Sequence, residues 1–101
     1  MAKGHRIEKE VKVKDFLDLI GGYNEKDIDI SDHALFRLKE SQRKIFKDRV
    51  IKECLLNETP ILVGIQFNGN YASFYKYGEN ILKIVLEFFQ VNIIVVTFYI
   101  L

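Results

Sequence analysis

The spacing of apolar positions along the chain changes at Pro60 and divides the sequence into two parts. Before Pro60, apolar residues recur every three to four positions among charged ones, which is the period of amphipathic helices. After Pro60, four runs rich in apolar residues, each seven to nine residues long, are separated by short polar segments, as is typical of strands. The pattern therefore predicts a helical layer over residues 13–57 and a sheet over residues 61–100.

The beginning of the chain predicts one short helix after a charged segment. Residues 1–11 alternate charges without a hydrophobic period, which indicates either a flexible segment or a short edge strand. Apolar residues at helical spacing over residues 13–20 predict the first helix, and Gly21 and Gly22 after it are a typical stop signal. Residues 23–30 are interpreted as a polar connection.

Two further helices are predicted in the first part. Ser31 and Asp32 are favoured N-cap residues, so the second helix should run from about residue 32 to residue 42. The apolar face of residues 46–55 predicts a third helix that ends near Asn57. The polar residues between the two favour a break, and one bent helix is the alternative.

The four runs after Pro60 are predicted to form one antiparallel sheet. Their connections are short and contain glycine or asparagine, and they span residues 68–70, 78–80 and 90–92. Connections this short join antiparallel neighbours. We therefore predict an α+β fold with two to three helices packed on one face of a four-stranded antiparallel meander sheet. Residues 13–101 would form this single domain, after a flexible N-terminal segment over residues 1–12.

Alternation along the last two strands predicts which side chains face the helices. On the last strand, the row expected in the core consists of Ile94, Val96, Phe98 and Ile100. The other face should then carry Ile93, Val95, Thr97 and Tyr99, together with Lys83 and Glu87 of the third strand. Apolar side chains on this second face need a cover, and the candidates are the N-terminal segment, a second copy of the chain or a cognate inhibitor. We expect the isolated chain to self-associate.

Charge and composition narrow the classes of partner. The net formal charge is only +1, but residues 33–56 hold seven Lys/Arg and three Asp/Glu, which gives +4. Such a basic segment favours an anionic partner such as RNA. Cys54 is the only cysteine, so we expect neither an intramolecular disulfide nor a cysteine-based zinc site, and its place on an apolar helix face predicts core packing.

Neither a membrane segment nor a cofactor is expected from the sequence. The longest apolar stretch, residues 93–101, is far shorter than the ~20 residues of a membrane-spanning helix. Residues 1–14 are charged throughout, unlike a signal peptide. The residues around His5 and His33 lack the pattern of a metal site, and glycine-rich phosphate loops are absent. We therefore expect a soluble, cytoplasmic protein without metal or cofactor.

His33 and Arg37 form the candidate catalytic pair of the first part. They are one helical turn apart, so both side chains should leave the same side of the second helix. An imidazole titrates near neutral pH and a guanidinium is a permanent cation, so the pair suits proton transfer beside a phosphate, as metal-independent RNA cleavage requires. A solvated or capping histidine is the alternative interpretation of His33.

The segment His33-Ala-Leu-Phe-Arg37, followed by an amphipathic helix and a meander that closes on Thr97-Phe-Tyr99, resembles the RelE/ParE-like toxin group and allied small domain families of unknown function. The resemblance covers about residues 30–101 and extends to the layout of barnase-type metal-independent ribonucleases. It implies His33 as acid or base, Arg37 as phosphate clamp, and Thr97 and Tyr99 as contacts to the scissile phosphate. The chain departs from the group at residues 41–44, where Arg43 fits only with a shift.

The resemblance implies an endoribonuclease toxin that acts on translation-associated or transfer RNA and is neutralised by a cognate antitoxin or immunity protein. The cations expected to bind RNA are Arg43, Lys44, Lys47 and Lys83, and a solvated helix face is the alternative for the first three. The row of Tyr71, Tyr75 and Tyr77 either stacks on bases or packs against neighbours. A protein-binding module of the same fold, or RNA binding without cleavage, is the alternative function.

Overall fold

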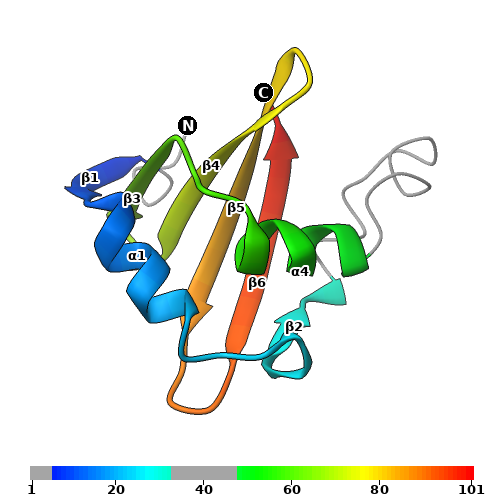
Figure 1. Cartoon of the computed structure of the whole chain (residues 1–101). Helices are drawn as coiled ribbons and strands as arrows, with labels where there is room; N and C mark the ends of the chain where they lie inside the picture. The colour runs from blue at the N-terminus through cyan, green and yellow to red at the C-terminus, as the bar shows by residue number, and fades with distance from the viewer. Residues whose placement is uncertain (1–5, 33–47) are drawn as a thin grey trace.

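The computed structural model describes residues 6–32 and 48–101 and shows helices packed against one face of a sheet (Figure 1). The elements follow in the order β1 (Ile7–Val11), α1 (Val13–Ile20), the 3-10 helix η2 (Glu25–Asp27), β2 (Ile28–Ile30), α4 (Asp48–Asn57), β3 (Leu62–Gln66), β4 (Tyr71–Tyr77), β5 (Asn80–Phe88) and β6 (Ile93–Ile100). The predicted bounds of the first helix and the predicted end of the third helix are confirmed. The predicted second helix, apart from Asp32, lies outside the described residues.

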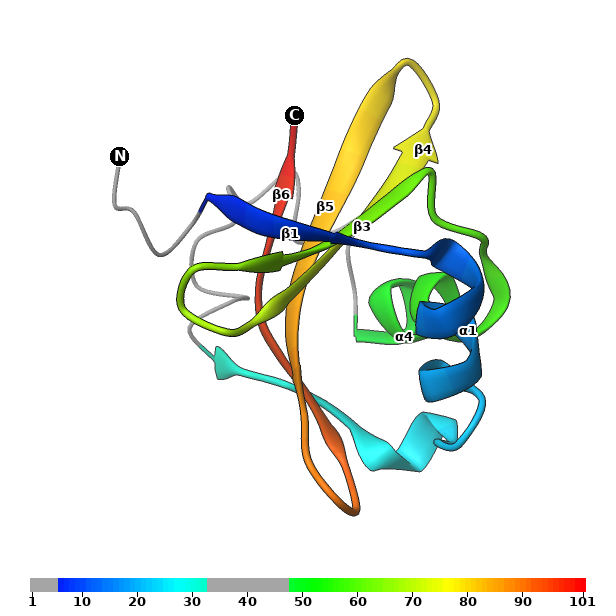
Figure 2. The ribbon, with the colours of Figure 1, turned by 90° about the vertical axis from the view of Figure 1, so that its left-hand side faces the viewer.

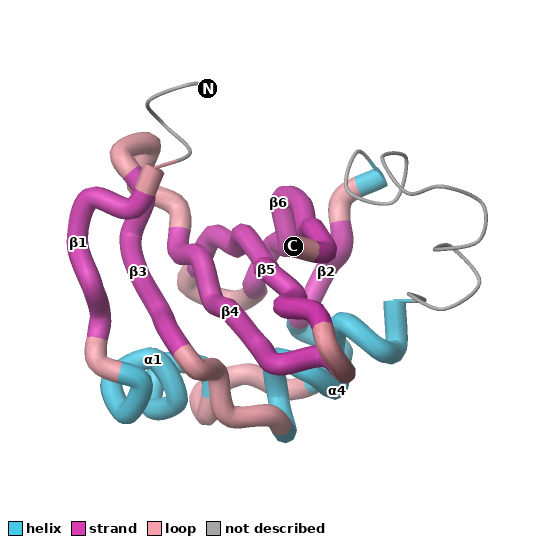
Figure 3. The backbone as a smooth tube through the Cα atoms, turned by 90° about the horizontal axis from the view of Figure 1, so that it is seen from above, coloured by secondary structure: helices cyan, strands magenta, loops and turns pink. Residues whose placement is uncertain are grey.

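The prediction of a four-stranded antiparallel meander is wrong, because the described residues form a mixed sheet of six strands. The strand order is β1-β3-β4-β5-β6-β2. β3 to β6 pair successively as antiparallel neighbours, β1 adds to β3 in antiparallel fashion, and β2 adds to β6 in parallel. The two described helices, α1 and α4, both lie on one side of this sheet (Figures 2 and 3).

β2 was missed, and β1 was predicted only as one of two alternatives, because their sequences carry little strand signal. β2 is only three residues long, and it lies in the segment interpreted as a polar connection. β1 is charged and exposed over most of its length, as edge strands often are, so the edge-strand alternative holds for residues 7–11. β1 fits closely against β3 at Gly64, where an added Cβ would lie 2.6 Å from Ile7 Cγ2 and 3.1 Å from the carbonyl oxygen of Lys9.

Two glycines form the turns of the central strands. Gly69, in the β3–β4 connection, has φ of +89°, which is the left-handed conformation predicted for it. Gly78 has φ of +60° and precedes Glu79 in the two-residue turn between the paired residues Tyr77 and Asn80. A positive φ at the first of two turn residues is the geometry of type II′ hairpins, which favour glycine there.

A β-bulge in β6 overturns the predicted alternation of its side chains. Val85 pairs with Thr97, but the next residue of β5, Leu86, pairs with Val95, so Val96 has no opposite residue. The extra residue shifts the parity of the strand. Ile93 and Val95 are therefore fully buried in the core, whereas the prediction placed them on the opposite face. Ile93 and Val95 therefore cannot contribute to an exposed apolar surface that would drive self-association.

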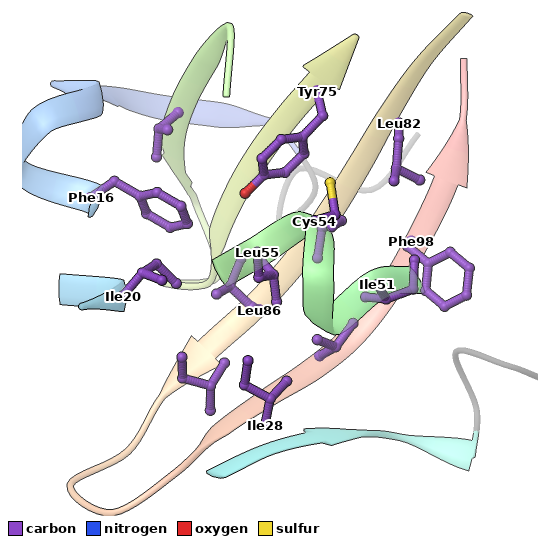
Figure 4. Close-up of a cluster of buried hydrophobic side chains, with 14 residues drawn as sticks. Phe16, Ile20, Ile28, Ile51, Cys54, Leu55, Tyr75, Leu82, Leu86 and Phe98 are labelled. Carbon is purple, nitrogen blue, oxygen red and sulfur yellow. The ribbon is translucent and has the colours of Figure 1, made fainter. Parts of the chain in front are cut away.

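The core lies between the helices and one face of the sheet (Figure 4). α1 contributes Phe16 and Ile20, and α4 contributes Ile51, Cys54 and Leu55, as expected from their apolar spacing. The sheet contributes mainly β-branched and leucine side chains from β5 and β6, completed by Phe98. The opposite face of the sheet has no described helix on it, and we call it the open face, although Ala72, Val85 and Thr97 at its centre are buried.

Candidate functional site: the open face of the sheet

Three predicted site residues lie on the open face, and five lie outside the described residues. The latter are His33, Arg37, Arg43, Lys44 and Lys47. Lys83 of β5 pairs directly with Tyr99 of β6, and Thr97 lies two residues before Tyr99 on the same side of β6. The strand register therefore brings Lys83, Thr97 and Tyr99 together, and we call them the open-face group.

Two aromatic rings flank the ammonium group of Lys83. Its Nζ lies 5.6 Å from the ring centroid of Phe74 and 5.9 Å from that of Tyr99. Phe74 and Tyr99 occupy this position because both are direct cross-strand neighbours of Lys83, one on β4 and the other on β6. Cation–π attraction at these distances holds the ammonium group over the rings. Phe74 was not predicted as a site residue, because only the register across three strands reveals it.

Thr97 is the buried member of the open-face group. Its side chain is 5% exposed, and its hydroxyl has no hydrogen-bond partner among the described residues. Lys83 and Tyr99 are only partly buried. A buried hydroxyl without a hydrogen-bond partner costs free energy.

The other end of the open face is acidic. Glu87 of β5 pairs with Ile94, which in turn pairs with Asp29 of β2. The carboxylate of Asp29 accepts a hydrogen bond of 3.0 Å from the Asn92 side-chain amide. An anionic ligand would therefore be attracted to the Lys83 end of the face and repelled from the Glu87 end.

Ser31 connects the end of β2 to the bulge beside Thr97. Its backbone N–H donates to the carbonyl oxygen of Val95 at 3.0 Å, and its hydroxyl donates to the carbonyl oxygen of Val96 at 3.0 Å. The sequence indicated Ser31 as an N-cap residue, and no sequence signal pointed to its contact with β6.

The tyrosine row of β4 lies on the opposite, helix-facing side of the sheet. Tyr75 is 2% exposed in the core, and the ring of Tyr71 packs at 6.2 Å from Phe16 and 4.9 Å from Phe88, measured between centroids. The packing interpretation therefore holds for Tyr71 and Tyr75. Tyr77, at the end of the strand, is partly exposed.

Cys54 of α4 and Tyr75 of β4 line the same hollow, and the pKa of each side chain is raised. Burial, and then the charge of Glu58, raise the pKa of the Cys54 thiol from 9.0 to about 12. Burial is also the main cause that raises the pKa of Tyr75 above its ordinary value. Neither the Ser73 nor the Tyr75 hydroxyl has a hydrogen-bond partner among the described residues. Cys54 is thus a protonated core residue near neutral pH and a poor nucleophile.

Raising the pH from 9 to 12 is expected to destabilise the protein through Cys54. In this range the unfolded chain loses a thiol proton that the folded chain keeps, because the folded pKa is about 12 and the ordinary value is 9.0. The free energy of unfolding therefore falls as the pH rises, by about 1.4 kcal/mol per pH unit. Urea unfolding of wild type and Cys54→Ala across this range measures the effect, and equal pH slopes for the two proteins would contradict it.

Two hollows formed by described residues lie away from the open-face group. One, of about 640 Å³, opens between β1 and α1 and is lined by residues that include Lys12, Asp15 and Tyr71. The other, of about 200 Å³, lies between α4 and β4 and includes Cys54 and Tyr75. The described residues contain no group of three or more His, Cys, Asp or Glu side chains able to hold a metal ion.

Comparison of the chain with protein-family models, with curated proteins and with solved structures finds no match. None of the helices in the described ranges 6–32 and 48–101 is long and apolar enough to cross a membrane.

Proposed function

We propose that the protein is a metal-independent endoribonuclease toxin that cleaves RNA in the cytoplasm and is neutralised by a cognate inhibitor protein. The observation that carries the proposal is the open-face group, in which a lysine, a tyrosine and a threonine share one face of two paired strands, and the threonine hydroxyl has no partner within residues 6–32 and 48–101. A cation beside aromatic rings suits a nucleotide, because phosphate binds the cation and bases stack on rings.

In this proposal, four of the predicted site residues and Phe74 have separate chemical roles. Lys83 and Arg37 offset the negative charge that develops on the phosphate, and Tyr99 donates a hydrogen bond to a phosphate oxygen. His33 transfers a proton, either from the ribose 2′-hydroxyl or to the leaving 5′-oxygen. Phe74 holds Lys83 from one side and offers a ring face to a base.

The covalent chain supports a link between His33 and the open-face group. Ser31 donates hydrogen bonds through its N–H and its hydroxyl to the carbonyl oxygens of Val95 and Val96, directly before Thr97 in β6. His33 follows Ser31 by only two residues in the sequence. Any residue at that separation is attached within about 7 Å of Ser31 along the backbone. In the proposal, the backbone of His33 is therefore within reach of the part of β6 that carries the proposed phosphate contacts.

His33→Ala and Tyr99→Phe are each expected to lower the rate of RNA cleavage at least tenfold, about 1.4 kcal/mol of barrier. Both changes remove a proposed reacting or hydrogen-bonding group. The assay is incubation of the purified protein with total RNA, with and without chelator, and the wild type should cleave in both. Tyr77→Phe is the matched control, since Tyr77 is a partly exposed tyrosine of β4 outside the open-face group. Equal activity of wild type and both site variants would disprove the assignment.

RNA binding without cleavage is the second candidate. The Lys83 ammonium group over the rings of Phe74 and Tyr99 favours it, because a cation and stacking rings bind a nucleotide without any group that transfers a proton. The same preparation separates the two functions: a wild type that shifts RNA in a gel but leaves it intact supports binding alone. In that case Lys83→Ala should weaken binding, whereas His33→Ala should weaken it little.

A further inference from the structure

We propose that Ser31 is a positioning residue that sets the orientation of the open-face group by holding the β-bulge at Val96. The importance of this orientation for RNA cleavage rests on the proposed function, whereas the effect of Ser31 on the geometry does not. Two hydrogen bonds of 3.0 Å carry the inference, one from the Ser31 N–H to Val95 and one from its hydroxyl to Val96.

The bulge decides which side chains in each half of β6 face the core. Before it, Val95 is buried on the helix side; after it, Phe98 is buried on the helix side, and Thr97 and Tyr99 share the open face with Lys83. With strict alternation from Phe98, Val95 would lie on the open face beside Thr97 and Tyr99. Val95 can face the core while Thr97 and Tyr99 lie on the open face only if one extra residue stands between the two halves of the strand.

The bulge needs a donor from outside the β5–β6 ladder. Val96 opposes no residue of β5, so its carbonyl cannot be satisfied by the regular pairing pattern of that strand. The part-buried hydroxyl of Ser31 supplies the hydrogen bond from the far side of β6. Without this hydroxyl, the carbonyl of Val96 would lose the hydrogen bond that Ser31 donates to it, and the extra residue could move along the strand.

Ser31 directly follows β2, and this position brings its side chain within hydrogen-bond distance of the bulge. β2 is only three residues long and pairs in parallel with β6, ending at Ile30 opposite Val95. The Ser31 N–H continues this ladder by one bond, and its hydroxyl adds a second bond one residue further along β6. A residue without a short side-chain donor at this position could form the first bond but not the second.

The test compares Ser31→Ala with Ser31→Thr, which keeps the hydroxyl. Amide chemical shifts are measured by NMR for Val95 to Tyr99, and RNA cleavage is measured in parallel. We expect Ser31→Ala to shift the resonances of this segment and to lower kcat/KM at least tenfold, and Ser31→Thr to restore both. Ser31→Cys, which retains the volume with a weaker donor, should fall between them. Ser73→Ala is the control, because it removes a buried hydroxyl from β4 that has no partner among the described residues.

The NMR and cleavage measurements distinguish failure of the positioning role from failure of the proposed function. Unchanged resonances of Val95 to Tyr99 in folded Ser31→Ala would overturn the positioning role, whatever the activity. Shifted resonances in a protein whose wild type never cleaves RNA would support the positioning role and refute the proposed function. Equal losses in Ser31→Ala and Ser31→Thr would also overturn the inference, since the second variant still carries the donor.

Discussion

Replacing Val95 by lysine is expected to unfold the protein, whereas lysine at the neighbouring Ile94 should leave it folded. Val95 is fully buried in the core, and an unpaired ammonium group there costs on the order of 4–5 kcal/mol or more. That loss is comparable with the whole stability of a small domain, roughly 5–15 kcal/mol. Ile94 is only partly buried on the open face, where a lysine can reach water. Circular dichroism during heating distinguishes the two variants.

This pair of variants tests the bulge directly. Alternation without a bulge places Ile94 in the core and Val95 on the open face, so it predicts the opposite result. A folded Val95→Lys protein together with an unfolded Ile94→Lys protein would therefore refute the register described for β6. Size-exclusion chromatography of the folded variant also shows whether the open face mediates self-association, which remains a prediction.

Phe16→Ala is expected to lower the free energy of unfolding by about 3–5 kcal/mol. Phe16 is fully buried, and its ring lies 6.0 Å from that of Phe88 and 6.2 Å from that of Tyr71. Phe16 is the one aromatic residue of α1, so its ring makes the aromatic contacts between this helix and the strands. Removing the ring leaves a cavity there. Urea unfolding followed by fluorescence or circular dichroism measures the loss.

Leu19→Ala is the matched control for this change, since Leu19 lies on the same helix and is 43% exposed. It should cost less than about 1 kcal/mol. Similar losses for Phe16→Ala and Leu19→Ala would mean that α1 does not depend on this aromatic contact.

The elements with strong local signals could be predicted from the sequence. α1 has apolar residues at helical spacing and a glycine stop, and the turns of the central strands have glycine at positions that require positive φ. β2 could not be predicted, because three residues are too short to establish a period of two. Its partner, β6, lies about 65 residues away, so only the tertiary structure supplies its hydrogen bonds.

The bulge could not be predicted for a different reason. Ile93-Ile-Val-Val96 is apolar and β-branched at every position, so either parity satisfies the hydrophobic pattern over this stretch. The polar residues Thr97 and Tyr99 fix only their own half of the strand. For this reason their face, shared with Lys83, was predicted and is found, whereas the face of Ile93 and Val95 was predicted wrongly.

The candidate site was therefore only partly visible in the sequence. Lys83, Thr97 and Tyr99 are polar residues in otherwise apolar strands, which makes them conspicuous. Phe74 and Ser31 are not conspicuous, since an aromatic residue in a strand and a serine before a helix are both ordinary. Their contacts depend on pairing across β4, β5, β6 and β2, which the sequence does not specify locally.

The strand order has a consequence for how the chain folds during synthesis. β1 and β2 come from the first 30 residues, yet they form the two opposite edges of the sheet, beside β3 and β6. Both are synthesised before their partner strands, and β2 can pair only after β6, the last strand of the sheet, has been made. Closing contacts between such distant segments is slow. The apolar side chains of Ile28 and Ile30 thus stay unprotected until β6 has been made, which is the period when a chaperone would be of most use to this protein.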